Sequence, residues 1–157
     1  MFEERVKLIT ENKDYFEEYV RFASNTIYES LASNKKIIFC GNGGSAAESQ
    51  HMAAEYVATL DHRRPRDGLC AIALTTDTSF ITAWSNDFGF ETIFSRQISV
   101  LGRKGDVLIC YSTSGNSINI LNAVKEAEKK ELNCLIFTGS NKNSGLANLS
   151  PKKNIIH

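Results

Sequence analysis

The stretch Ile37-Ile38-Phe39-Cys40-Gly41-Asn42-Gly43-Gly44-Ser45 decides the fold, because a short apolar run turns through small residues into a helical pattern. A second stretch repeats this arrangement, since Val107-Leu108-Ile109-Cys110-Tyr111 leads into Ser112-Thr113-Ser114-Gly115-Asn116-Ser117. A strand that turns in this way into a helix presents free backbone N–H groups and the positive end of the helix dipole. We therefore expect two turns that hold a small phosphorylated molecule. Neither turn matches the GxGxxG or GxxxxGK[ST] pattern of a nucleotide site.

Strand-like and helical patterns alternate along the rest of the chain. Strands separated by helices indicate βαβ units and a parallel sheet, so the predicted class is α/β with three layers. In such a sheet a ligand lies beyond the carboxyl ends of the strands, where the strand order reverses, and both turns fall on that edge. The strand candidates are 36–40, 69–74, 106–111 and 133–138, and the helical stretches are about 45–60, 91–101 and 117–130.

The first part of the chain is predicted to be a helical hairpin outside this repeat. Residues 3–33 contain no Gly or Pro, and Asn12 to Asp14 is expected to break the segment or join two helices. The apolar stripe of this segment must be buried on the sheet or on another subunit, and we favour an oligomer contact. The stripe consists of Phe16, Val20, Ala23, Ile27 and Leu31.

Length and composition fit one globular domain, with helices over 1–33 and the sheet region over 34–157. The 157 residues include 18 Lys and Arg and 18 Asp and Glu, so the formal net charge is zero. That balance argues against a nucleic-acid partner and fits a chain that self-associates. The N-terminus lacks the pattern of a signal peptide, and no apolar run approaches the roughly 18 residues of a membrane span. We therefore expect a cytoplasmic protein with no membrane partner.

The four cysteines lie in or beside apolar, strand-like runs, and none forms a CxxC pair. We expect buried thiols in a reducing compartment rather than disulfides or metal ligands. The residues concerned are Cys40, Cys70, Cys110 and Cys134.

The helix after the first turn carries His51 and Glu55, one helical turn apart on the same face. Such a pair can share a metal, or can act as an acid and a base over a bound ligand. The alternative is an ordinary surface interaction between the two side chains. Glu48, one turn earlier, is interpreted as a first-turn acid that the helix dipole stabilises.

Three other polar stretches leave alternatives open. The arginines of 61–68 are either solvated or reach an anionic ligand across a subunit boundary. The segment 86–90 is either a turn with two aromatic packing anchors or a ligand loop. Asp77 or Ser79 is expected to cap the helix that follows the second strand.

Together these residues resemble the sugar-isomerase (SIS) domain family and, within it, the phosphoheptose isomerases. The resemblance runs from about residue 2 to residue 150 and rests on seven motifs in order. They are Cys-Gly-Asn-Gly-Gly-Ser (40–45), Gln-His-x-x-x-Glu (50–55), Ala-Ile-Ala-Leu-Thr-Thr-Asp (71–77), Asn-Asp-Phe-Gly-Phe (86–90), Phe-Ser-Arg-Gln (94–97), Gly-Asp-Val-Leu (105–108) and Ser-Thr-Ser-Gly-Asn-Ser (112–117).

The resemblance implies a flavodoxin-like parallel sheet flanked by helices, assembled as a homotetramer through a central helical bundle. It implies a phosphorylated sugar as substrate, with sedoheptulose 7-phosphate converted to glycero-manno-heptose 7-phosphate for lipopolysaccharide or capsule. The residues implied to bind substrate are Asn42, Gly43, Ser45, Asp87, Ser112, Thr113, Ser114 and Ser117.

The resemblance also implies the catalytic group. Glu55 would be the base that moves a proton between C1 and C2 through a cis-enediol, and His51 and Glu55 would supply part of a zinc site. Such a reaction needs a carboxylate base, an acid and an electrophile that stabilises the enediolate oxygen.

The sequence departs from the family pattern in two places. Ala58-Thr59 stand where the family has Gly-Arg, and Arg63, Arg64 or Arg66 would have to substitute. The family's final helix, with its Gln metal ligand and catalytic His, has no match, and we do not assign His157 to that role. A zinc ion would then keep two protein ligands, fewer than the usual three. Three explanations stay open: a sequence cut short, a premature stop in the gene, or a non-catalytic relative that binds phosphosugars or a replication initiator.

Overall fold

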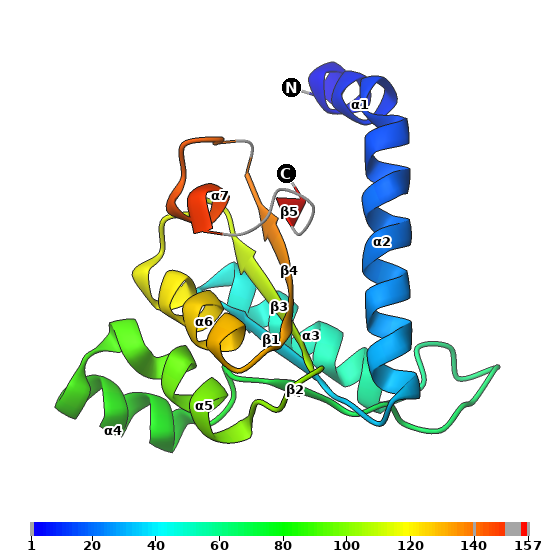
Figure 1. Cartoon of the computed structure of the whole chain (residues 1–157). Helices are drawn as coiled ribbons and strands as arrows, with labels where there is room; N and C mark the ends of the chain where they lie inside the picture. Colours follow the sequence, from blue (N-terminus) through cyan, green and yellow to red (C-terminus); the bar gives the residue numbers. More distant parts are fainter. Residues whose placement is uncertain (1, 140, 150–154, 157) are drawn as a thin grey trace.

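The structure is a computed structural model that describes residues 2–139, 141–149 and 155–156. Helices and strands alternate after two N-terminal helices (Figure 1). Their order is α1 (Phe2–Glu11), α2 (Lys13–Ala32), β1 (Ile37–Gly41), α3 (Gly44–Val57), β2 (Ala71–Ala73), α4 (Thr78–Phe88), the 3₁₀ helix η1 (Phe90–Thr92), α5 (Ile93–Leu101), β3 (Val107–Ser112), α6 (Ile118–Lys129), β4 (Asn133–Thr138), α7 (Gly145–Leu149) and β5 (Ile155–Ile156).

The strands of the described residues form one parallel sheet in the order β2-β1-β3-β4-β5. The strand order reverses between β1 and β3, where Cys40 lies opposite Cys110 and Gly41 opposite Tyr111. Both sequence-predicted turns leave the sheet at this point. The predicted flavodoxin-like topology is therefore confirmed.

Helices cover both faces of the sheet, which gives the three predicted layers (Figure 1). Alternate residues along each strand face opposite layers. Ile38, Cys40 and Leu108 pack toward α5 and α6, whereas Phe39 and Ile109 pack toward α2 and α3. The central strands β1 and β3 read as nearly continuous apolar runs because both of their faces are buried.

The two N-terminal helices are present, and Asn12 separates them as expected. The C-terminal half of α2 packs on the sheet through Ala23, Ile27 and Leu31. The other half continues away from the sheet, and α1 lies across its end (Figure 1). None of the residues of α1 is buried, and Val20 on α2 is 62% exposed. The apolar stripe is thus only partly covered within this chain.

A helix capped by Asp77 or Ser79 was expected after the second strand, without bounds, and the structure shows it as α4 over Thr78–Phe88. Its sequence, Thr-Ser-Phe-Ile-Thr-Ala-Trp-Ser-Asn-Asp-Phe, is rich in residues of low helix propensity. The helix begins with the predicted cap, since the Asp77 carboxylate accepts a hydrogen bond of 2.9 Å from the N–H of Phe80. The rings of Phe80, Trp84 and Phe88 then stack along one side of it. Among the described residues, no helix has the length and apolar character needed to cross a bilayer.

Three of the four cysteines are buried, as predicted, and none of the four is in a disulfide. Cys40 and Cys110 lie on the paired strands β1 and β3, and their Sγ atoms are 3.4 Å apart. Burial of Cys70 was predicted wrongly. This residue comes just before β2, which is an edge strand with only one neighbour, and its side chain is exposed.

The difference in exposure between Cys70 and the three buried thiols predicts a selective chemical reaction. Hydrogen bonding to Cys40 and burial raise the pKa of the Cys110 thiol, and burial raises that of Cys134 to about 12. Because the thiolate is the reactive form, brief treatment of the folded chain with iodoacetamide at pH 7.5 should alkylate Cys70 alone. Peptide mass spectrometry measures this outcome, and urea-unfolded chain, in which all four thiols should react, is the control. Equal labelling of Cys110 in the folded chain would contradict the packing described above.

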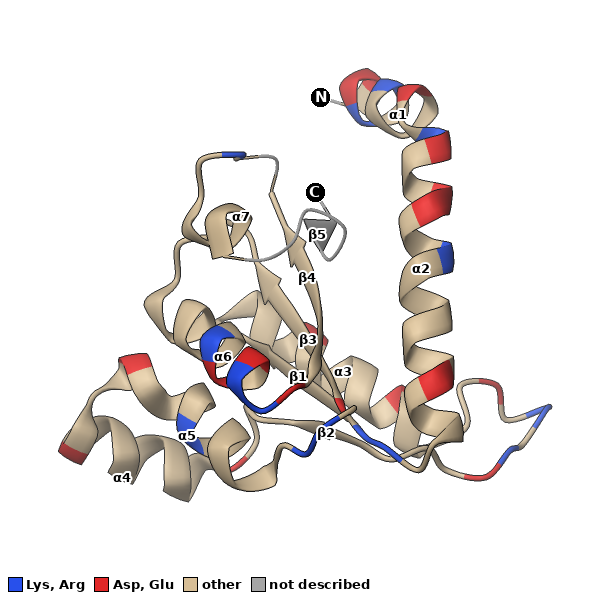
Figure 2. Cartoon of the chain, viewed as in Figure 1, with Lys and Arg blue, Asp and Glu red and all other residues tan. Residues whose placement is uncertain are grey.

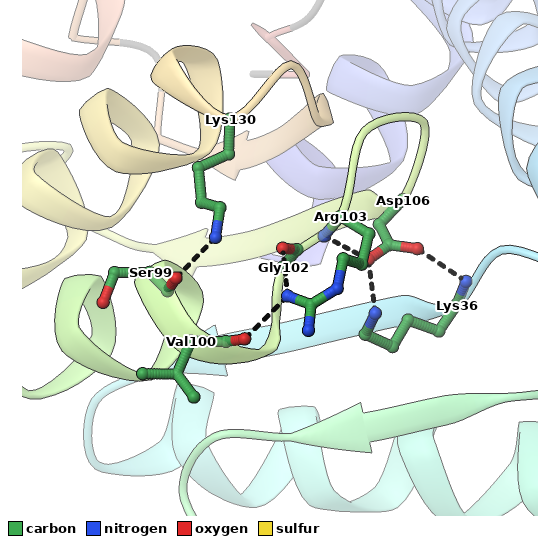
Figure 3. Close-up of polar contacts among 7 residues, drawn as sticks. All are labelled: Lys36, Ser99, Val100, Gly102, Arg103, Asp106 and Lys130. Atoms are coloured by element: carbon green, nitrogen blue, oxygen red, sulfur yellow. Dashed lines mark hydrogen bonds and ion pairs between the residues drawn. The ribbon is translucent and has the colours of Figure 1, made fainter.

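A buried carboxylate joins the amino ends of β1 and β3 (Figure 3). Asp106 is 1% exposed and precedes β3, and it accepts hydrogen bonds from two elements. Its oxygens receive the Lys36 N–H at 3.0 Å, the Lys36 Nζ at 2.5 Å and the Arg103 N–H at 2.8 Å. This network holds together the two strands that carry the turns on the opposite edge.

We expect Asp106→Asn to lower the free energy of unfolding by about 2 kcal/mol, because the amide places an N–H₂ group where one carboxylate oxygen accepted hydrogen bonds and removes the charge opposite Lys36. Urea denaturation followed by circular dichroism gives the value. Asp67→Asn, at an exposed loop position, is the matched control and should change stability by less than about 0.5 kcal/mol. An Asp106 variant as stable as that control would show that the network contributes little.

Candidate functional site

A cavity of about 210 Å³ lies where the strand order reverses, between the turn after β1 and the turn after β3. Its lining comes from the start of α3, the end of β3 and the segment that leads into α6. The lining residues are Asn42, Ser45, Tyr111, Ser112, Thr113, Ser114 and Ser117. The structure thus brings together every predicted substrate-binding residue except Gly43 and Asp87.

Glycines allow both turns to close tightly. A Cβ atom on Gly41 would lie 2.6 Å from the Cβ of Ser45, so only glycine lets α3 start this close to the end of β1. Gly115 has a φ of +66°, and a Cβ there would lie 2.6 Å from Ser144 Oγ. The Gly115 N–H donates to the hydroxyl of Ser112 at 3.2 Å, which folds the second turn over the end of β3.

The residues that line the cavity carry no formal charge, so the attraction for an anion comes from backbone dipoles and hydroxyl donors. Helices α3 and α6 both begin at the cavity, with Gly43 and Ser117 as their N-cap residues. Neither helix has a side-chain hydrogen bond at its cap. The N–H groups of Ser45, Ala46 and Ile120 donate to backbone carbonyls of the two turns. The N–H groups that precede them at the helix starts remain for a ligand, and the positive ends of two dipoles converge on one small space.

Tyr111 is a lining residue that the sequence analysis did not assign to the site. It is the last residue but one of β3 and packs against the rings of Phe39 and Phe137. Burial, and secondarily the carboxylate of Glu48, raises the pKa of Tyr111 well above its usual value. A tyrosine hydroxyl is protonated near neutral pH and offers one donor and one acceptor to the cavity that Tyr111 lines.

His51 and Glu55 lie farther along α3, outside the cavity lining. The His51 Nδ1 and Glu55 Oε1 atoms are 4.0 Å apart, and the Glu55 side chain is 32% exposed. Glu55 follows Ser45 by ten residues, which corresponds to about 15 Å along the helix axis. The predicted base and the predicted phosphate turn are thus on one helix but at different ends of it.

The predicted zinc site is not formed by the described residues alone. Among residues 2–139, 141–149 and 155–156, no three His, Cys, Asp or Glu side chains are grouped so that they could hold a metal ion. His51 and Glu55 offer two donors, whereas catalytic zinc sites use three protein ligands. These residues by themselves do not fit the ion, and we derive no chemical step through it.

Asp87 lies on the last turn of α4, exposed, and accepts a hydrogen bond from the neighbouring Asn86. The segment 86–90 is the end of a helix followed by η1. The packing alternative holds in part, because the Phe88 ring stacks on that of Trp84 with centroids 4.2 Å apart, although Phe88 is 62% exposed and Phe90 52% exposed.

Two of the three arginines of the 61–68 loop have local side-chain partners. Arg66 donates to the carbonyl oxygens of Glu55 at 2.9 Å and Tyr56 at 3.0 Å, which caps the end of α3. Arg63 pairs with Asp61 and lowers the pKa of that carboxyl. Of the remaining histidines, His62 is exposed, and His157 lies outside the described residues.

A second residue missed from the sequence is Asn119, the second residue of α6, which is 3% exposed. Its side-chain amide forms two hydrogen bonds with that of Asn42, from Asn42 Nδ2 to Asn119 Oδ1 at 2.9 Å and from Asn119 Nδ2 to Asn42 Oδ1 at 2.8 Å. The available signal was a polar residue in the first turn of an otherwise apolar helix face.

Residues 2–139 of the chain match the family model of the SIS domain. A phosphoheptose isomerase from Burkholderia pseudomallei is 52% identical over 121 residues, which are 77% of this chain and 60% of the relative. One from Neisseria gonorrhoeae is 48% identical over 117 residues, 74% of this chain and 58% of the relative. The chain therefore spans about 60% of the length of the curated relatives it matches.

Two solved structures share the fold closely. A phosphoheptose isomerase from Neisseria gonorrhoeae superposes with a TM-score of 0.84 at 39% identity, covering 98% of this chain and 79% of the other. One from Francisella tularensis superposes with a TM-score of 0.85 at 32% identity, covering 98% and 78%.

Proposed function

The chain belongs to the SIS domain family, and from that premise we propose that it is an aldose–ketose isomerase of phosphorylated sugars. The proposed reaction converts sedoheptulose 7-phosphate to glycero-manno-heptose 7-phosphate, in the cytoplasm, for lipopolysaccharide or capsule. The observation that carries this proposal is the cavity at the reversal of strand order. The similarity to several phosphoheptose isomerases supports the choice of sugar.

In this proposal the cavity binds the phosphate group. Hydroxyl donors come from Ser112, Thr113, Ser114 and Ser117, and N–H donors come from the first turns of α3 and α6. Asn42 and Ser45 lie on the other side of the same space, where they contact the start of the sugar chain. Gly43 provides backbone in the first turn, with a φ of +55°.

Glu55 is proposed as the base. Its carboxylate takes the C1 proton of the ketose, which leaves a cis-enediolate. A hydroxyl proton then passes from O1 to O2, and the carboxylate delivers its proton to C2 to give the aldose. The proton that leaves one carbon is the proton bound to the carboxylate, so no oxidant or reductant is needed. The Nδ1 atom of His51 lies 4.0 Å from the Glu55 Oε1 atom, on the same face of α3.

The separation along α3 constrains how the substrate lies. With about 15 Å of helix between Ser45 and Glu55, the sugar must extend from the cavity along α3, or it must meet Glu55 of a second copy. An extended seven-carbon substrate suits the first arrangement better than a short one. Asp87, on α4, could meet sugar hydroxyls only beyond the phosphate cavity.

We also propose that the chain forms a homotetramer through its N-terminal helices. The charged residues of α2 gather on the side turned away from the sheet (Figure 2). Large apolar side chains of α1 remain exposed, including Phe2 at 81% and Ile9 at 63%. Burying such surface is favourable by about 25 cal/mol for each Å² removed from water, and a helical bundle of several copies would do so.

The proposed function is tested by incubating the purified chain with sedoheptulose 7-phosphate, with and without added zinc, and by identifying the products by NMR. Formation of an aldose heptose 7-phosphate supports the proposal. Binding of the sugar phosphate with no aldose formed would reject isomerisation by this chain and favour a phosphosugar-binding protein instead. A requirement for zinc would show that ligands beyond His51 and Glu55 complete a metal site.

A further inference from the structure

The pair of hydrogen bonds between Asn42 and Asn119 links the two turns of the cavity. Asn42 lies between β1 and α3, and Asn119 lies in the first turn of α6. The two amides exchange hydrogen bonds of 2.9 and 2.8 Å. Apart from the sheet itself, this pair is a direct connection between the first turn and the second.

Asn119 occupies a position where an apolar residue would otherwise be expected. Its neighbours on the buried side of α6 are Ile120, Ala123 and Val124, and each of them is 0% exposed. A buried side-chain amide is costly unless its donors and acceptor are satisfied. Among the described residues, the hydrogen-bond partner of the Asn119 side chain is Asn42. The contact with Asn42 therefore accounts for a buried polar residue at this place.

The pair leaves part of Asn42 available. A side-chain amide has two N–H donors and an oxygen with two lone pairs, and the reciprocal pair uses one of each. Asn42 is half-buried and lines the cavity, whereas Asn119 does not. One N–H and one lone pair of Asn42 thus remain for a ligand, while the hydrogen bonds with Asn119 fix the plane of its amide.

We propose that Asn119 is a positioning residue, which holds the Asn42 amide in place for a sugar phosphate bound in the cavity. This inference rests on the proposed phosphosugar function. Asn119 acts through Asn42 and not on the ligand. Loss of Asn119 frees Asn42 to rotate, so that binding must order this side chain again.

A double-mutant cycle tests the coupling. The affinity for sedoheptulose 7-phosphate is measured by isothermal titration calorimetry for the unaltered chain, Asn42→Ala, Asn119→Ala and the double variant. Removing one such hydrogen-bonded partner should weaken binding by about fivefold to tenfold. If Asn119 acts only through Asn42, the double variant should bind no more weakly than Asn42→Ala alone.

The matched control is Asn122→Ala on the same helix. Asn122 is half-buried, lies outside the cavity lining and donates to the carbonyl oxygen of Glu91 at 3.0 Å, so its loss should leave the affinity unchanged. Asn119→Leu is a second variant for the case in which Asn119→Ala fails to fold. It keeps the size of the side chain but forms no hydrogen bond with Asn42, and the same loss of affinity is expected. Thermal unfolding of every variant identifies those that are folded.

The outcomes separate the two levels of the proposal. No binding by the unaltered chain would reject the phosphosugar function and this inference with it. Binding by the unaltered chain, with equal affinity in the folded Asn119 variants, would reject the inference alone. Losses that multiply in the double variant would also reject it, since Asn119 would then act independently of Asn42.

Discussion

Glu55→Gln is expected to reduce proton exchange between sedoheptulose 7-phosphate and water by at least about a hundredfold, the lower end of what a positioned general base contributes. The amide keeps the size and most of the packing of the carboxylate but cannot accept the C1 proton. Because Glu55 lies outside the phosphate cavity, the affinity for the sugar phosphate should stay within about threefold. NMR measures the exchange, and calorimetry measures the affinity.

Glu48→Gln is the matched control for this variant. Glu48 is an exposed carboxylate on the same helix, two turns before Glu55, and it is not in the lining of the cavity. It undergoes the same change of charge and should keep its exchange activity. Exchange retained by Glu55→Gln would remove Glu55 from the role of base. Equal losses of exchange activity in both variants would show that the negative charge of α3, and not the position of Glu55, is what matters.

Replacing Ser114 and Ser117 together by Ala is expected to weaken sugar-phosphate binding by about 2 kcal/mol or more, which is roughly 30-fold, because each serine contributes a hydrogen bond to a charged group. Ser117 is the N-cap residue of α6 but makes no side-chain cap bond, so its loss should cost little stability. The affinity is measured by calorimetry with sedoheptulose 7-phosphate.

The control for this pair is the double change of Ser95 and Ser99 to Ala on α5. Both hydroxyls donate to carbonyl oxygens of their own helix, from Thr92 and Arg96, and neither lines the cavity. Binding should then be unchanged. An affinity of the Ser114 and Ser117 variant equal to that of this control would reject the second turn as the phosphate site.

The phosphate turns could be predicted from the sequence because each turn consists of consecutive residues. Gly41 to Ser45 and Ser112 to Ser117 follow apolar runs directly, and a strand, a turn and a helix start are local features. The parallel sheet makes the carboxyl ends of β1 and β3 meet. Two segments that are far apart in the sequence therefore line one cavity.

Residues whose role depends on strand order were harder to predict. Tyr111 and Asn119 join the site because β1 lies beside β3, which no local pattern records. Exposure of Cys70 follows from the edge position of β2, which a sequence of apolar residues does not distinguish from a central strand. Helix α4 depends on an aspartate cap and stacked rings rather than on helix propensity.

The distance between Glu55 and the cavity is also a property of the folded chain. Periodicity places His51 and Glu55 on one face of α3. The structure adds that the pair lies in the second half of the helix, far from its first turn. Isomerisation requires that both regions act on one molecule. The proposed isomerisation therefore requires that the substrate's phosphate bind at one end of α3 while its proton is removed near the other end.

The most direct test of this account is NMR of sedoheptulose 7-phosphate mixed with the purified chain in D₂O, with and without zinc. If Glu55 is the base, deuterium enters the carbon next to the carbonyl group of the sugar with the unaltered chain and does not enter it with Glu55→Gln. If the sugar phosphate binds at saturating concentration and no deuterium enters under either condition, the chain does not remove the proton, and the proposal of an isomerase is wrong.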